Sequence, residues 1–176
     1  MRSHPELITL RRQAVQALTS LNLRGTFTFS ELHERIERHR GRPVHLIPRD
    51  LPALAPHGLW VAGEHADYVF YAANANQVRQ RLIIGHEYGH MIFDDASTPA
   101  EFDQVAAMLM PDVDPSVSQI MLARRTYDQP IERRAEVFGT VVVQRAESWS
   151  DLPVAVADPE VSARLASTLE GRPGAW

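Results

Sequence analysis

The chain has 176 residues, a net charge of −4 and no cysteine. This length predicts one domain with a real core, and the lack of cysteine excludes a disulfide framework and any cysteine-based zinc site. The acidic balance does not favour direct binding of nucleic acid. The N-terminus lacks the apolar core of a signal peptide and no apolar run reaches the length of a membrane span, so we expect a cytoplasmic protein without a membrane partner.

Two helices are predicted first. Apolar residues recur at helical spacing over residues 6–23, and Gly25 is the expected end of this helix. The second helix is expected over residues 31–40, with Ser30 as its N-cap and Gly41 as its stop.

The second helix is strongly charged. We expect its two histidines, His33 and His39, at the surface. A basic cluster is also expected on a solvated face and consists of Arg35, Arg38, Arg40 and Arg42.

Short runs rich in β-branched and aromatic residues follow, separated by turn-forming residues. They predict a small antiparallel three-stranded sheet, with strands in residues 43–47, 58–62 and 68–71. His65 falls in the connection between the last two strands, where we expect a turn residue rather than a ligand. Asn74 or Asn76 is the expected N-cap of the next helix.

The next helix, expected over residues 76–93, carries the sequence His86-Glu87-Tyr88-Gly89-His90. Residues four apart project from nearly one side of a helix, so His86 and His90 can bind one ion with Glu87 beside it. Neutral imidazoles suit Zn²⁺, which lowers the pKa of a bound water to about 7, and a neighbouring carboxylate can take its proton. Apolar flanking residues indicate burial, where these polar groups would be costly without partners. The pattern therefore predicts a zinc site.

Two glycines, Gly85 and Gly89, share a further face of the same helix. Glycine inside a helix costs stability, and close approach of another backbone would explain that cost.

The segments after this helix differ in how clearly they can be interpreted. We expect a loop over residues 94–99 and a helix over residues 100–110, whereas residues 111–128 give no clear pattern. A helix is predicted over residues 130–147, although Thr140-Val141-Val142-Val143 would suit a strand equally well.

The expected fold class is α+β, with N-terminal helices, a small sheet, the helix of the histidine motif and further helices. These elements belong to residues 1–150. Residues 151–176 are expected to be a C-terminal linker with a short helix over residues 160–169 and a loose end.

A catalytic zinc site has three protein ligands and one position for water, so one ligand is still required. A third histidine at the spacing H-E-x-x-H-x-x-G-x-x-H is excluded, because Phe93 and Ala96 occupy those positions. No histidine follows His90. The third ligand is therefore expected to be a carboxylate.

The strongest carboxylate candidates are Glu132 and Glu136, which share one face of the later helix, so periodicity alone does not rank them. Surface ion pairs with neighbouring arginines are the alternative role for both. Asp94 and Asp95 are less suitable. Asp94 lies one turn beyond His90 on the same helix, and its short side chain would have to reach back along the axis.

From about Asn74 to Val143 the chain resembles the ImmA/IrrE family of bacterial metallopeptidases. The resemblance is carried by Asn74 with the Arg79 to Arg81 lead-in, by the H-E-Y-G-H motif with Met91 and Ile92, and by Glu132-Arg133-Arg134-Ala135-Glu136-Val137-Phe138-Gly139. The last piece looks like the family's E-x-x-A-(N/E)-x-(F/L)-A segment. Gly139 replaces the usual alanine and Glu136 the frequent asparagine, and the tail after Trp149 is not covered.

The resemblance implies that His86, His90 and Glu132 are the zinc ligands of a gluzincin-like site and that Glu87 is the general base. Glu136, one turn on, could then orient a ligand histidine through its other ring nitrogen. Tyr127 is the candidate oxyanion donor, although a core or loop tyrosine is the commoner role.

Members of this family act in the cytoplasm on a helix-turn-helix repressor and cut it to release transcription, so the implied partner is a protein substrate of this kind. Two other functions stay open. One is a regulatory module of a toxin–antitoxin-like pair that binds metal and docks without proteolysis, against which the intact Glu87 argues. The other is a zinc hydrolase that acts on a small molecule.

Overall fold

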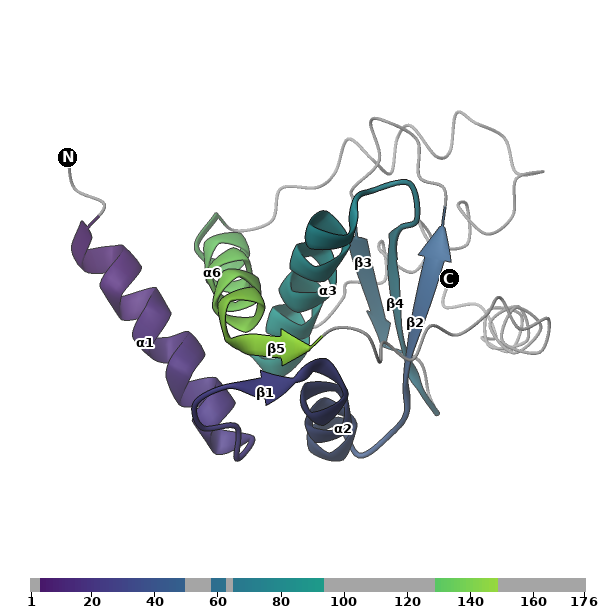
Figure 1. Ribbon diagram of the computed structural model, residues 1–176, viewed down its shortest axis with the longest axis horizontal. Helices are drawn as coiled ribbons and strands as arrows, with labels where there is room; N and C mark the ends of the chain where they lie inside the picture. Colours follow the sequence, from purple (N-terminus) through teal and green to yellow (C-terminus); the bar gives the residue numbers. More distant parts are fainter. Residues whose placement is uncertain (1–3, 50–57, 63–64, 94–128, 149–176) are drawn as a thin grey trace, which may run out of the picture.

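The structure, a computed structural model, describes residues 4–49, 58–62, 65–93 and 129–148. Within these ranges it has four helices, a three-stranded sheet and a two-stranded sheet, which is an α+β fold as predicted (Figure 1). Several predicted segments lie outside the described residues. They are the expected loop and helix of residues 94–110, the segment of residues 111–128 that gave no clear pattern, and the C-terminal linker and helix of residues 151–176. None of the helices in the described part of the chain is long and apolar enough to cross a membrane.

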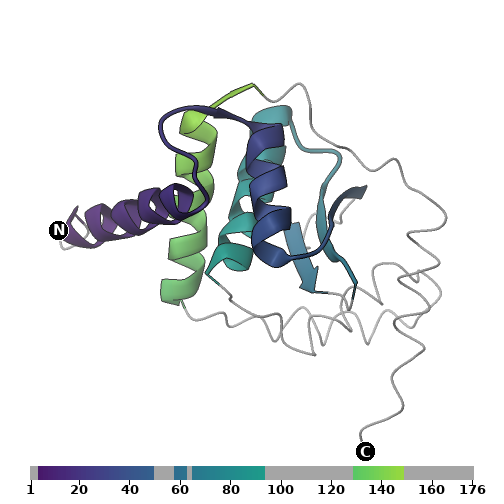
Figure 2. The same ribbon diagram turned by 90° about the horizontal axis from the view of Figure 1, so that it is seen from below.

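Helix α1 (His4–Ser20) packs against α6 (Gln129–Arg145) and crosses it, and its buried residues include Ala14 and Leu18 (Figures 1 and 2). It ends earlier than expected because Asn22, three residues before Gly25, already takes the left-handed conformation, with a φ of 61°. The backbone N–H of Leu23 then donates to the carbonyl of Leu18 at 2.9 Å, and that of Asn22 to Thr19 at 3.0 Å. This is the Schellman pattern that closes a helix.

Helix α2 (Phe29–Arg40) follows the two-residue strand β1 (Phe27–Thr28). Its N-cap is Thr28 rather than Ser30, because Glu31 completes a capping box with Thr28. The Thr28 N–H donates to the Glu31 carboxylate at 2.7 Å, and the Glu31 N–H donates to the Thr28 hydroxyl at 3.2 Å. Gly41 is the C-cap, as predicted, with a left-handed φ of 68°.

The main sheet has the order β2 (Val44–Arg49), β4 (Asp67–Ala72), β3 (Gly58–Ala62). Three strands were expected, but the prediction that all are antiparallel is wrong. Strands β3 and β4 are antiparallel because their connection is short, whereas β2 and β4 are parallel. The chain between β2 and β4 includes β3 and is long enough to return in the same direction. His65 is exposed in the β3–β4 connection, as expected.

Helix α3 (Gln77–Ile92) lies between the sheet and α6 (Figure 1). Asn76 is its N-cap, and its side chain accepts the N–H of Arg79 at 3.0 Å. Helix α6 includes residues 140–143, so the alternative strand there is not formed. The chain leaves α6 directly into β5 (Ala146–Ser148), a short strand that we did not expect and that pairs in parallel with β1.

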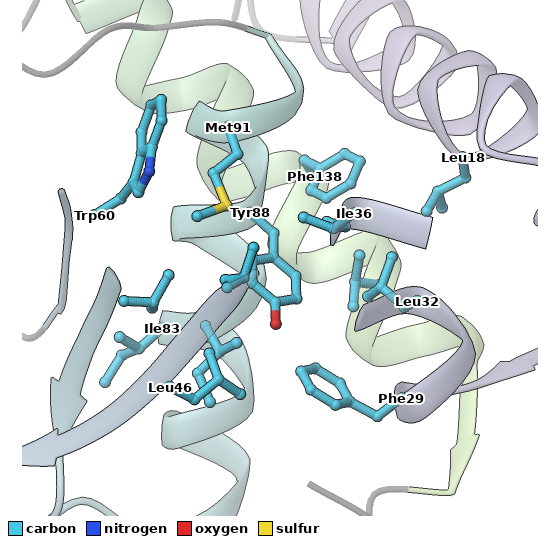
Figure 3. Packing of buried hydrophobic residues seen from close by; sticks show 14 of the residues in the cluster. Leu18, Phe29, Leu32, Ile36, Leu46, Trp60, Ile83, Tyr88, Met91 and Phe138 are labelled. Atoms are coloured by element: carbon cyan, nitrogen blue, oxygen red, sulfur yellow. The ribbon is translucent and has the colours of Figure 1, made fainter. Parts of the chain in front are cut away.

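The core lies where α1, α2, α3, α6 and the sheet meet. Tyr88 on α3 is fully buried near its centre and stacks on Phe29 of α2, with ring centroids 5.8 Å apart (Figure 3). The core around it also includes Leu18, Leu32, Ile36, Leu46 and Phe138 from other elements, and Met91 from α3 itself.

His33 was expected at the surface, and that prediction is wrong. Its exposed fraction is 7%. The ring bridges two elements: Nδ1 lies 2.5 Å from the Tyr88 hydroxyl and Nε2 lies 3.4 Å from the Glu37 carboxylate. These two partners allow the imidazole to be buried without an orphaned nitrogen. His39 is exposed, as predicted.

The basic cluster is not a single solvated face either. Asp67 at the start of β4 is fully buried, and it accepts Arg40 Nε at 2.8 Å and pairs with Arg42 Nη2 at 3.0 Å. The Arg40 guanidinium also lies over the Trp60 ring, 4.9 Å from its centroid. Arg38 has the expected surface role, in an exposed pair with Glu34. The buried carboxylate draws two of the four arginines inward because a buried charge needs such partners.

Candidate metal centre

Two ligand candidates come from consecutive turns of α3. His86 and His90 have their rings edge to face, with centroids 4.7 Å apart, and their Nε2 atoms are 3.0 Å apart. The side chain of His90 is buried, whereas that of His86 is 26% exposed. The helical spacing of four residues therefore brings both Nε2 atoms to one point, as the sequence predicted.

The third candidate comes from the first turn of α6. Glu132 places Oε2 at 3.5 Å from His86 Nε2 and Oε1 at 3.4 Å from His90 Nε2. The three ligand atoms lie within 4.8 Å of one another, and no other such group of histidine, aspartate and glutamate occurs in the described residues. Ligands bonded tetrahedrally to zinc at about 2.1 Å are themselves about 3.4 Å apart. The observed separations of 3.0 to 3.5 Å are close to that spacing, so these residues could hold a metal ion.

A metal ion would interact favourably with all three groups. If both imidazoles were protonated, two cations would face each other across 3.0 Å. One metal cation between the two neutral imidazoles and the Glu132 carboxylate, 3.4 to 3.5 Å away, would be attracted by each of them.

Small residues allow α6 to bring Glu132 this close. A Cβ on Gly89 would lie 2.9 Å from the Cα of Ala135, and a Cβ on Gly85 would lie 3.0 Å from the Cα of Gly139. The face of Gly85 and Gly89 is therefore covered by another backbone, as the sequence predicted. The two helices run antiparallel, since residue 85 meets residue 139 and residue 89 meets residue 135.

Glu87 projects toward the sheet rather than toward α6. Its exposed fraction is 6%, and its carboxylate lies against Gly58 at the start of β3. Sequence reasoning did not identify Gly58 as part of the site, because nothing local distinguishes it from a glycine that simply begins a strand.

Tyr88 of α3, which lies between the two candidate ligand histidines in the sequence, forms a buried pair with His33 of α2. Burial is the main effect that lowers the pKa of His33, and the nearby Glu37 carboxylate opposes it only in part. Burial also raises the pKa of Tyr88 well above 10, and the charge of Glu37 adds to this. The Tyr88 hydroxyl therefore stays protonated and donates to a neutral imidazole.

Of the remaining candidates, the structure describes Glu136. Glu136 is exposed, which does not favour a carboxylate that orients a ligand histidine from behind. Tyr127, Asp94 and Asp95 lie outside the described residues. Comparisons of the chain with protein-family models, with curated proteins and with solved structures found no significant match.

Proposed function

We propose that this protein is a zinc-dependent endopeptidase. The observation that supports the proposal best is the meeting of two imidazoles from α3 with the carboxylate of Glu132 from α6, at separations of 3.0 to 3.5 Å. Two neutral nitrogen ligands and one oxygen ligand suit Zn²⁺ and leave a fourth position open.

Each residue has a distinct role in the proposed reaction. His86, His90 and Glu132 would hold the ion. A zinc ion bound there supplies Lewis-acid polarisation of a carbonyl group and a water of lowered pKa. Glu87 would accept the proton of the attacking water and deliver it to the leaving amine. Its buried position beside β3 restricts the directions in which that carboxylate can turn.

The sheet supports a peptide substrate over a small molecule. Strand β3 is at the edge of the order β2-β4-β3, and within the described residues no further strand pairs with its outer side. It also packs against α3, and its first residue contacts Glu87. An extended peptide that pairs with such an edge would run close to the general base. The resemblance to ImmA/IrrE peptidases favours a helix-turn-helix repressor in the cytoplasm as the substrate.

The test compares three samples: the zinc-loaded protein, the same protein after removal of the metal, and zinc-loaded Glu87→Gln. Each is incubated with the helix-turn-helix repressor encoded nearest to the gene and, in parallel, with a mixed peptide library, and products are identified by mass spectrometry. We expect cleavage only by the zinc-loaded wild type, because the amide of Glu87→Gln fills the same space but accepts no proton.

Other outcomes would favour the alternatives. A repressor that binds tightly but stays intact would indicate a regulatory module without proteolysis. Hydrolysis of small amides without any peptide cleavage would indicate a small-molecule hydrolase. Equal activity of wild type and Glu87→Gln would show that Glu87 is not the general base.

A further inference from the structure

Gly58 is placed where the edge strand meets the side chains of α3. It pairs with Tyr71 across the β3–β4 ladder, and its Cα faces Ile83 and Glu87, which are one turn apart on α3. A Cβ at this position would lie 2.6 Å from Glu87 Oε1 and 3.3 Å from Glu87 Cδ, and even closer to Ile83 Cγ2. The carboxylate therefore occupies the space that any other residue would fill.

The backbone conformation at position 58 does not explain why this residue is a glycine. Among the described residues only Gly25 and Gly41 are glycines with a positive φ, so an L-residue could adopt the backbone of Gly58. Glycine in a strand interior weakens the strand and often marks a close approach of another group. The group here is the carboxylate of Glu87.

We infer that Gly58 is a positioning residue for the general base: its missing side chain gives the Glu87 carboxylate the place from which it can take a proton. The inference rests on the proposed function, in which Glu87 is that base. It also implies that the strand proposed to bind the substrate and the group that takes the proton are in direct contact. A shift of β3 would then move both together.

The size of the effect follows from the contact distance. Ordinary contact with a Cβ begins at 3.4 Å, and Glu87 Oε1 would be at 2.6 Å in Gly58→Ala, so the carboxylate must move by about 0.8 Å. A misplacement of about 1 Å can lower a catalytic rate by about 100-fold. We therefore expect Gly58→Ala to lower kcat by about that factor, with little change in KM.

The experiment uses zinc-loaded wild type, Gly58→Ala, Ile83→Ala and the double variant. Ile83→Ala removes the Cγ2 atom on the other side of the new methyl group, so that this methyl group can lean away from Glu87. We expect the kcat of the double variant to be at least tenfold higher than that of Gly58→Ala. The kcat of Ile83→Ala alone should stay close to that of the wild type. Zinc affinity, measured by competition with a chromophoric chelator, should change less than threefold in Gly58→Ala, because the three ligands face α6 instead of β3.

Crystal structures of the zinc-bound wild type and Gly58→Ala give a readout that needs no substrate. A displaced Glu87 carboxylate in Gly58→Ala supports the positioning of Glu87 by Gly58 even if wild type cleaves no peptide, and the missing cleavage then counts against the proposed function and the role of Glu87 as its base. An unmoved carboxylate with an unchanged kcat would overturn the inference. A kcat that falls in parallel with zinc affinity and does not recover in the double variant would also overturn it, since the change would then be a general loss of structure.

Discussion

Gly139→Ala tests whether the crossing of α3 and α6 sets the metal centre. The new Cβ would lie 2.8 Å from the backbone nitrogen of His86, and 3.1 Å from both the carbonyl carbon of Gly85 and the carbonyl oxygen of Leu82. All three are backbone atoms of α3 and cannot rotate away. Helix α6 would have to recede by about 0.6 Å to reach ordinary contact, which is an overpacking change.

Two opposing terms set the expected stability. Overpacking of this kind costs about 1 to 3 kcal/mol, whereas replacing glycine by alanine inside a helix gains about 1 kcal/mol. The zinc-free variant should therefore lose at most about 2 kcal/mol of unfolding free energy. Zinc affinity should fall more clearly, by on the order of 10- to 100-fold. The reason is that α6 carries Glu132, and ligand distances tolerate changes of only about 0.2 Å.

Zinc affinity is measured by competition with a chromophoric chelator, and stability by urea unfolding of the zinc-free protein. Thr140→Ala is the matched control, because Thr140 is the next residue of α6 and its hydroxyl, within the part of the chain that the structure describes, bonds to the Glu136 carbonyl of its own helix. The control should keep wild-type zinc affinity. Wild-type zinc affinity in Gly139→Ala, together with equal or higher stability, would refute the reasoning.

Three further outcomes are expected. Elemental analysis should find about one zinc per chain, lost on acidification because the imidazoles must be neutral to bind; protein that takes up no zinc would contradict the site. Glu132→Ala should lower zinc affinity far more than Glu136→Ala, and the reverse order, measured by chelator competition, would exchange their roles. Burial lowers the pKa of His33 in the folded protein, so the unfolded chain binds more protons and the free energy of unfolding should fall as the pH drops below about 6.5. His33→Gln should flatten that fall in urea unfolding of zinc-free protein, and an identical pH slope would assign it to other groups.

The sequence predicts more of the candidate site than of the fold around it. His86 and His90 are fixed by helical spacing alone, and that spacing is a local property. The choice of Glu132 over Glu136 is not local, since both lie on one face of α6. It depends on the rotation of α6 against α3, which the contacts of Gly85, Gly89, Ala135 and Gly139 determine.

The errors in the fold also arise from contacts between distant segments. The charge pattern of α2 suggested a solvated face, but Asp67, 27 residues beyond Arg40, accepts that arginine in the interior. The parallel pairing of β2 with β4 was also not predicted, because it joins strands that are not consecutive in the chain. The order of the strands in the sheet, which decides their relative direction, is not a local property of the sequence. The local signal for the Gly41 C-cap predicted it correctly, and Asn76 is one of the two N-caps that were expected for α3.

The glycine at position 139 also serves this crossing of α3 and α6. A methyl group there would meet the α3 backbone at His86 itself, so the absence of a side chain lets α6 reach the motif. The five residues of the motif then meet different partners: His86 and His90 face Glu132, Glu87 contacts Gly58, Tyr88 bonds to His33, and Gly89 packs on Ala135. The proposed zinc chemistry accounts for three of them. The other two contact the helices on either side: Tyr88 bonds to His33 of α2, and Gly89 lets the backbone of α6 pack closely, so that Glu132 reaches the two histidines.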